Sequence, residues 1–263
     1  MSAPAPIGVF DSGVGGLSVL REICRELPHE GLLYVADSGH APYGDRPAAF
    51  IQSRAVAITS FLIHQGAKAV VVACNTATGA AVDLLRQTFS LPIIAIEPAV
   101  KPAAAATRSG VVGVLATSVT LSSTNLLRLV GQYPAPGGTV MQACPGLVEQ
   151  VEKGEIDTPE TRVLVEQYVR PLLEQKADTI VLGCTHYAFL EAVIQRAAGP
   201  DVTVIDPAPA VARELRRRLA LSSLLAPDDA APSEHFWTSG DCDQGTRVIG
   251  QLLGRRVDVL PLP

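Results

Sequence analysis

The chain is poor in charged residues and has no excess of positive charge. Only 18% of its 263 residues are Asp, Glu, Lys or Arg, and the net charge at pH 7 is -5. Soluble domains usually contain about 25% charged residues, so the low content indicates an extensive buried core. The negative balance makes a broad basic face unexpected, which argues against nucleic acid and anionic membrane surfaces as partners.

Long uninterrupted apolar segments are also absent. Charge-free stretches such as 109–127 contain Ser, Thr and Gly, whereas a membrane-spanning helix needs about 20 mostly apolar residues. The N-terminal segment has neither the basic region nor the apolar region of a signal peptide. The sequence therefore predicts a cytoplasmic protein with no membrane segment.

The cysteines lack the spacing of a disulfide framework or of a zinc site. They are five, an odd number, at Cys24, Cys74, Cys144, Cys184 and Cys242. We expect free thiols in a reducing compartment and no bound metal, because no CxxC or paired Cys/His spacing occurs. Packing and catalysis remain as their roles, and the position of Cys24 on the apolar face of its helix favours packing.

What the chain does have is an alternation of short β-branched runs and helical patterns. Continuous apolar runs are typical of strands buried on both faces of a parallel sheet. They predict eight strands, at 7–10, 32–36, 69–73, 93–96, 111–115, 140–143, 179–182 and 202–205. Helical patterns between them, such as 17–27 and 48–64, indicate an α/β fold. The tail adds a basic helix at 213–219, a strand at 235–238 and a helix at 243–253.

The two halves of the chain look like copies of each other. A shared strand composition explains the Val and Ile residues, but not a cysteine at the same strand end in both halves, so we interpret the pattern as a duplication. Eight strands also fit a TIM barrel, and in either fold functional groups lie at the carboxyl ends of the strands. The matching segments are IGVFDSG (7–13) with VGVLATS (112–118), AKAVVVACNT (67–76) with ADTIVLGCTH (177–186), and IEPA (96–99) with IDPA (205–208).

Cys74 and Cys184 occupy the equivalent turns of the two halves, each after a buried strand and before a helical pattern. The N-terminus of a helix favours a thiolate, so the matched pair indicates catalysis rather than packing. Polar residues follow the neighbouring strands, among them Asp11, Ser12 and His186. These side chains suit a small polar ligand or the tuning of a thiol, although Ser, Thr, Asp and Asn also favour helix caps.

Cofactor patterns are incomplete. The segment 13–18 (GVGGLS), with Asp37 further on, resembles a dinucleotide-binding turn. Ser18 stands at the third glycine position, however, and Asp11 would repel a pyrophosphate. The chain has four lysines, none in an evident phosphate-binding context for pyridoxal phosphate. The sequence therefore predicts activity without a cofactor.

Together, several strings resemble the bacterial glutamate racemases of the cofactor-independent aspartate/glutamate racemase superfamily. The resemblance implies two pseudo-symmetric α/β domains with open, mainly parallel sheets and an active site between them. It places the first domain at 1–98 plus 208–263 and the second at 99–207. It also implies interconversion of L- and D-glutamate, which supplies D-glutamate for peptidoglycan and the cell wall. The strings are FDSGVGGLSVL (10–20), YVADSGHAPYG (34–44), VVACNTAT (71–78), ACPGLVEQVE (143–152) and VLGCTHY (181–187).

The resemblance also implies roles for individual residues. Cys74 acts on D-glutamate and Cys184 on L-glutamate; Asp11 assists Cys74, and His186 with Glu152 assists Cys184. The resemblance implies glutamate as the small-molecule partner, no cofactor, and allows a homodimer. The substrate contacts it implies are Asp11, Ser12, Tyr43, Gly44, Asn75, Thr76, Thr185 and His186.

Three alternatives stay open at this stage. An aspartate or broader amino-acid racemase of the same superfamily would differ in side-chain room, which a sequence reveals poorly. A Cys–His hydrolase needs one nucleophile and leaves the second matched cysteine unexplained. A non-enzymatic partner-binding protein on the same fold would not depend on either thiol. The chain also departs from the usual family pattern at Ala188, where Pro is common, and in the loop 144–149.

Overall fold

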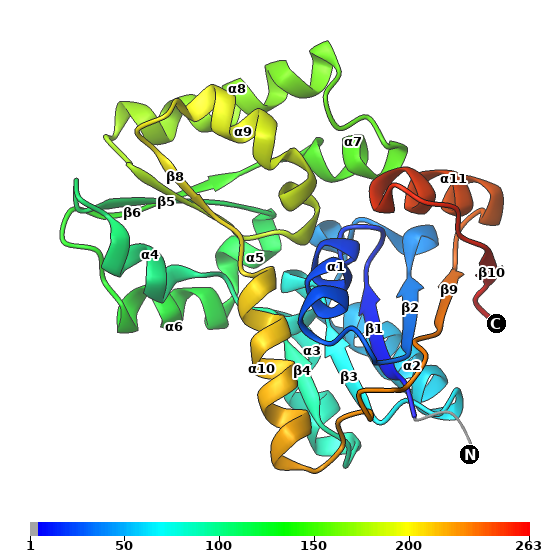
Figure 1. Ribbon diagram of the computed structural model, residues 1–263. Coiled ribbons are helices and arrows are strands. Elements are labelled where there is room, and N and C mark those ends of the chain that lie inside the picture. Colours follow the sequence, from blue (N-terminus) through cyan, green and yellow to red (C-terminus); the bar gives the residue numbers. More distant parts are fainter. Residues whose placement is uncertain (1–4) are drawn as a thin grey trace.

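Two separate sheets of parallel strands form the framework in the computed structural model, which describes residues 5–263 (Figure 1). Residues 1–4, on which part of the signal-peptide interpretation falls, lie outside the described residues. The first sheet has the order β10-β9-β2-β1-β3-β4, with β1 (Ile7–Asp11), β2 (Leu32–Ala36), β3 (Ala69–Val72), β4 (Ile93–Ala95), β9 (Glu234–Thr238) and β10 (Val259–Pro261). The second has the order β6-β5-β7-β8, with β5 (Val111–Ala116), β6 (Gly138–Ala143), β7 (Thr179–Leu182) and β8 (Thr203–Ile205).

The strand order repeats between the two halves. In both, the first strand of the half lies in the middle, between the second and the third, and the fourth lies outside the third. All the paired strands run parallel. This arrangement confirms the expected α/β fold with two similar open sheets. Within residues 5–263 neither sheet closes into a barrel.

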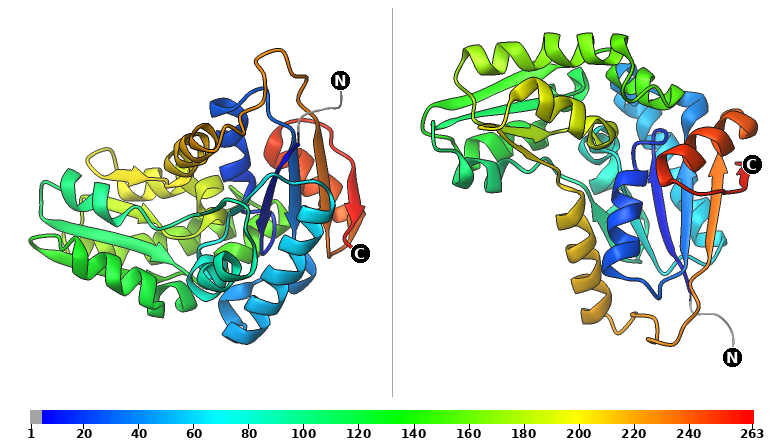
Figure 2. Two further views of the ribbon diagram at one scale, coloured as in Figure 1. Left: turned by 90° about the horizontal axis from the view of Figure 1, so that it is seen from below. Right: turned by 45° about the horizontal axis from the view of Figure 1, so that its top comes forward.

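Helices cover both faces of each sheet (Figures 1 and 2). On the first sheet α1 and α10 pack on one face and α2 and α3 on the other. On the second sheet α8 and α9 lie opposite α4 and α6. The helices are α1 (Leu17–Glu26), α2 (Ala48–His64), α3 (Asn75–Thr88), α4 (Val100–Ala106), α5 (Ser118–Ser122), α6 (Thr124–Gln132), α7 (Leu147–Lys153), α8 (Pro159–Glu174), α9 (Glu191–Ala198), α10 (Ala208–Leu221) and α11 (Cys242–Leu253).

The C-terminal tail joins the first sheet. Strand β9 pairs with β2, and β10 extends the sheet at its edge. Helix α11 then lies beside α7 of the second half, where Gln251 Nε2 donates a hydrogen bond to the carbonyl of Gly154 at 2.7 Å (Figure 1). The tail therefore also contacts the second sheet's helices. The division at residues 98/99 and 207/208 stays a prediction.

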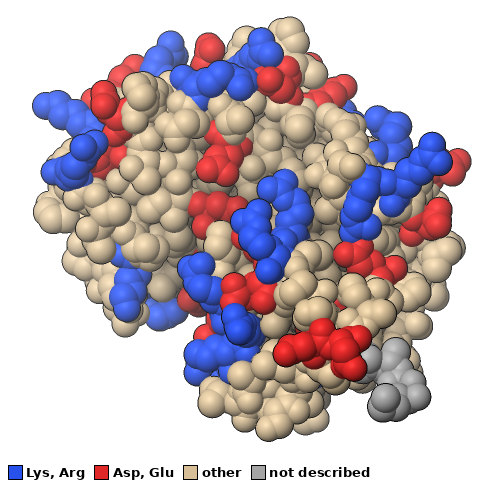
Figure 3. All heavy atoms as spheres, viewed as in Figure 1, with Lys and Arg blue, Asp and Glu red and all other residues tan. Residues whose placement is uncertain are grey.

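Charged side chains of both signs mix on the surface shown in Figure 3. In the basic run on α10, Arg216 pairs with Glu26 at 3.0 Å and Arg217 with Glu214 at 2.7 Å. Both arginines are exposed, so the run is a solvated helix face. No helix in residues 5–263 combines the length and the apolar character needed to cross a bilayer.

Candidate active site

The two matched cysteines line one narrow cavity between the sheets. Cys74 follows β3 and caps α3, and its Sγ accepts a hydrogen bond from the backbone N–H of Ala77 at 3.4 Å. Cys184 follows β7 and precedes the 3₁₀ helix η3 (Thr185–Leu190). Both are buried, with 4% and 8% of their surface exposed. The cavity is also lined by Ser12, Pro42, Tyr43, Gly44, Asn75, Thr76, Thr117, Val148, Thr185 and His186.

The structure therefore brings nearly all of the expected site residues to one place. Asp11 and Glu152 are not among the lining residues, and both lie beside His186, which is. Pro42 and Val148 line the cavity although sequence reasoning did not single them out. Both lie in strings that carry the family resemblance, Pro42 in 34–44 and Val148 in 143–152, which was a usable signal.

The side-chain amide of Asn75 is buried and unpaired. Only 6% of the residue is exposed, and neither Nδ2 nor Oδ1 finds a hydrogen-bond partner in residues 5–263. Leaving a buried polar atom unpaired costs about 1–3 kcal/mol. An amide that offers a donor and an acceptor to the thiol-lined cavity indicates a polar ligand there.

On the Cys184 side, an imidazole links the thiol to a carboxylate. His186 Nδ1 lies 3.7 Å from Cys184 Sγ, and His186 Nε2 lies 2.6 Å from Glu152 Oε1. Burial opposes a charge on His186, but its hydrogen bonds to Cys184 and Glu152 prevail and raise its pKa well above the usual 6.5. An imidazole with this pKa can hold the proton that the Cys184 thiol gives up when it becomes a thiolate.

On the Cys74 side, a buried carboxyl group faces the thiol. Asp11 Oδ2 accepts hydrogen bonds from the N–H groups of Gly13 at 3.2 Å and Gly16 at 3.0 Å, and it lies 3.9 Å from His186 Nδ1. Burial raises the pKa of Asp11. Burial and the charge of Asp11 raise the pKa of Cys74 above its usual value. Cys74 therefore favours the protonated thiol in the unliganded protein.

The glycine-rich turn after β1 makes room for residues of the second half. A Cβ at Gly13 would lie 1.9 Å from Glu152 Oε1, and one at Gly15 would lie 2.2 Å from His186 Nδ1. A Cβ at Gly16 would lie 2.7 Å from that of Asp11. These close approaches account for the glycines that resemble a nucleotide-binding pattern.

Asp37, the acidic residue of that pattern, already has partners. It is fully buried and receives two hydrogen bonds from Arg54, at 2.7 and 2.9 Å, and one from the Tyr43 hydroxyl at 2.5 Å. Burial opposes ionisation of Asp37, but the bonds from Arg54 and Tyr43 prevail and lower its pKa. Asp37 thereby fixes Tyr43 at the cavity. Arg54 was not predicted, because no motif contains it.

Replacing Arg54 with Met should destabilise the protein by about 3–5 kcal/mol, because the buried Asp37 charge loses its bidentate partner. The lowered pKa of Asp37 means that its stabilisation is present above its unfolded value of 3.8 and is lost as the pH falls through the lower folded value. The difference between R54M and the unchanged protein in urea unfolding should therefore be larger at pH 7 than near pH 3. Arg86→Met, on the exposed face of α3, is the matched control. An equal loss in both variants would contradict this role of Arg54.

The described residues offer no obvious metal centre. No group of three or more His, Cys, Asp or Glu side chains between residues 5 and 263 is arranged to hold a metal ion. None of the four lysines lines the thiol cavity. The cavity is lined by two thiols, one imidazole and an unpaired amide. Thiols and an imidazole can transfer protons to and from a small polar molecule.

Comparisons with known proteins agree with this chemistry. The sequence profile of the Asp/Glu/hydantoin racemase family matches residues 7–215. The chain is 54% identical to a glutamate racemase from Methylococcus capsulatus over 98% of its own length and 95% of that protein's. Its structure resembles a glutamate racemase isoform from Bacillus anthracis, with a TM-score of 0.89, 35% identity, and coverage of 100% of this chain and 98% of that one. It also resembles Escherichia coli glutamate racemase in complex with L-glutamate and the activator UDP-MurNAc-Ala, with a TM-score of 0.86, 31% identity and 98% coverage of both chains.

Proposed function

Because the chain belongs to the Asp/Glu/hydantoin racemase family, we infer that it is an isomerase that interconverts L- and D-glutamate. The observation that supports this most directly is the pair of buried thiols, brought from the two sheets to one cavity. Inversion at a carbon requires removal of the proton from one face and return of a proton to the other. Two acid/base groups from opposite sides accomplish this without turning the substrate.

We propose that Cys74 and Cys184 are these two groups. For L-glutamate, the Cys184 thiolate takes the α-proton and the Cys74 thiol gives its proton to the opposite face. Cys184 is then a thiol, Cys74 a thiolate, and the product D-glutamate. The reverse direction exchanges the roles. His186 takes the proton from Cys184 before L-glutamate reacts, which its raised pKa and its distance of 3.7 Å support.

Substrate binding follows from the polar lining of the cavity. We propose that the Asn75 amide binds the amino acid, because its donor and acceptor are otherwise unpaired. Ser12, Thr76 and Thr185 add hydroxyl groups to the cavity lining, and Tyr43 and Gly44 also line it. No arginine lines this cavity in the described residues, so the carboxylates rely on hydroxyl, amide and backbone N–H donors.

The alternatives fit these observations less well. A Cys–His hydrolase would use Cys184 with His186 and leave the buried Cys74 without a role. A protein that only binds a partner does not need two buried thiols in one cavity. Between glutamate and aspartate we propose glutamate as the substrate, because the similar proteins named above are glutamate racemases.

Purified protein dialysed against a strong chelator should convert either pure enantiomer of glutamate to an equal mixture of both. We expect this because thiols and an imidazole supply all the proton transfers, without a Schiff base or a metal-bound water. Circular dichroism follows the reaction, and an absorbance scan tests for bound pyridoxal phosphate. L-Aspartate is the control substrate and should react at least about tenfold more slowly, since one missing methylene is worth about 1–3 kcal/mol. Loss of activity that zinc restores, or faster reaction with aspartate, would contradict the proposal.

We also propose that the enzyme works in the cytoplasm, because a two-thiol mechanism needs both cysteines reduced. The five cysteines are free, none forming a disulfide. A homodimer is the assembly that we propose for the protein in solution, on the resemblance alone.

A further inference from the structure

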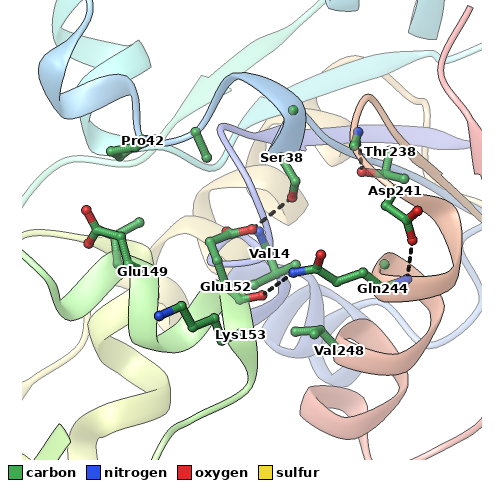
Figure 4. Close-up of a pocket in the computed structure, with 15 residues that line it drawn as sticks. Val14, Ser38, Pro42, Glu149, Glu152, Lys153, Thr238, Asp241, Gln244 and Val248 are labelled. Atoms are coloured by element: carbon green, nitrogen blue, oxygen red, sulfur yellow. Dashed lines mark hydrogen bonds between the residues drawn. The ribbon is translucent and has the colours of Figure 1, made fainter. Parts of the chain in front are cut away.

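Besides its bond to His186, the Glu152 carboxylate accepts two hydrogen bonds from the first half of the chain. Its Oε1 accepts a hydrogen bond from the N–H of Val14 at 2.7 Å, and its Oε2 accepts one from the Ser38 hydroxyl at 2.9 Å. Val14 and Ser38 belong to the loops after β1 and β2 of the first sheet, whereas Glu152 lies on α7. Figure 4 shows the Ser38 hydroxyl pointing at the Glu152 carboxylate across the junction.

The two oxygens of Glu152 therefore have different tasks. Oε1 is shared by His186 Nε2, at 2.6 Å, and the Val14 N–H. Oε2 points the other way, and the Ser38 hydroxyl binds it. Bonds at both oxygens fix the rotation of the carboxylate, and the carboxylate in turn fixes the imidazole ring. A ring with Nε2 on Glu152 presents Nδ1 to Cys184, which is the orientation needed to exchange a proton with the thiol.

A cavity beside the Glu152 carboxylate leaves room for it to move, so its position depends on the hydrogen bond from Ser38. The cavity has a volume of about 370 Å³ and is lined by Val14, Ser38 and Glu152, together with residues of α7 and α11. Glu152 keeps 16% of its side chain exposed there. Without the hydroxyl, Oε2 loses its bond and borders the open cavity, so the carboxylate can rotate away from His186.

We propose that Ser38 is a positioning residue, which acts through Glu152 and His186 on the protonation of Cys184. The proposal rests on the racemase function proposed above. The Ser38–Glu152 bond joins the two halves. The chain of contacts from Ser38 through Glu152 and His186 to Cys184 is therefore complete only when the loop after β2 contacts α7. Ser38 does not line the thiol cavity, and it therefore affects proton transfer rather than substrate binding.

The test is a set of variants assayed with both enantiomers of glutamate. S38A should lower kcat about tenfold and change KM less than twofold, and S38T, which keeps the hydroxyl, should restore most of the activity. Gln244→Ala is the matched control: Gln244 lines the same cavity, and its side chain donates a hydrogen bond to the backbone carbonyl of Glu152, at 3.5 Å, and not to the carboxylate. It should keep kcat within twofold of the unchanged enzyme.

A double-mutant cycle separates positioning from a general structural role. In a Glu152→Gln background, S38A should have no further effect on kcat, because its influence passes through that carboxylate. An equal tenfold loss in both backgrounds, an unchanged kcat in S38A, or no rescue by S38T would overturn the proposal.

A measurement that does not depend on catalysis separates the test of Ser38 from the test of the racemase function. Nitrogen-15 NMR of labelled histidine, with His186→Asn to assign the signal, should show a changed protonation state or tautomer of His186 in S38A but not in Q244A. An unchanged His186 signal in S38A would overturn the proposal even if the unchanged enzyme racemises glutamate. An inactive unchanged enzyme would instead count against the racemase function.

Discussion

Cys74→Ala and Cys184→Ala should each lower racemisation of glutamate by about 10³-fold or more, since each removes one of two obligatory acid/base groups and such groups typically contribute 10²–10⁴-fold. The loss should be equal in both directions of net inversion, because inversion needs a proton transfer at both faces. Both side chains are small and buried, so alanine leaves little unfilled space and the fold should persist. Chiral analysis of the product, with circular dichroism of the protein as the folding control, checks this result.

The two variants should differ in the proton exchange that they retain. In D₂O, Cys74→Ala keeps the Cys184 thiol and should exchange the α-proton of L-glutamate slowly, without inversion. Cys184→Ala should do the same with D-glutamate. Each variant is the matched control of the other. Exchange of the same enantiomer in both variants, or racemisation within tenfold of the unchanged enzyme in either, would contradict the assignment of the two thiols.

Much of this site could be predicted because its reactive side chains follow equivalent strands in the two halves of the chain. The strands 32–36 and 179–182 have the bounds expected from their continuous apolar runs, since burial on both faces leaves a strong local signal. Cys74 and Cys184 follow equivalent strands, so the internal repeat alone indicated a pair. Cys74 and Cys184 then line the same cavity, because that cavity lies between the two halves.

Features that depend on distant contacts left no such signal. Arg54 binds Asp37 and Ser38 binds Glu152, on other elements of the fold. Arg54 lies in no motif, and the string 34–44, which contains Ser38, does not show which of its residues contacts Glu152. Strand β10 has three residues and ends in Pro261 at a sheet edge, so its apolar pattern is too short to recognise. The choice between a barrel and two open sheets is likewise decided by how the strands are ordered, which local periodicity does not encode.

The glycine-rich turn is the case in which a local pattern was informative for an unexpected reason. A nucleotide-binding turn needs glycines so that backbone can approach a pyrophosphate. Here Gly13 and Gly15 let the backbone approach Glu152 and His186, which come from the second half of the chain. The physical requirement, a surface without a Cβ, is the same for both uses, and only the partner differs.

Gly15→Ala should therefore lower kcat by about 10²-fold or more, an effect of the size seen when acid/base groups are displaced. The added Cβ would lie 2.2 Å from His186 Nδ1, the atom that faces Cys184. The imidazole has 2% of its side chain exposed and cannot move aside without losing Glu152. Steady-state kinetics with L- and D-glutamate check this expectation.

Gly131→Ala is the matched control for the same chemical change. Gly131 lies in α6, and a Cβ there would meet no atom within 4 Å. This variant should keep full activity and gain about 0.5–1 kcal/mol of stability, because alanine in a helix loses less conformational entropy on folding than glycine. Full activity in G15A would contradict the close approach of His186 to this turn. Unfolding of G15A at the assay temperature would mean that the contact supports the fold of the whole chain, whereas a folded, inactive G15A places its effect on the imidazole that serves Cys184.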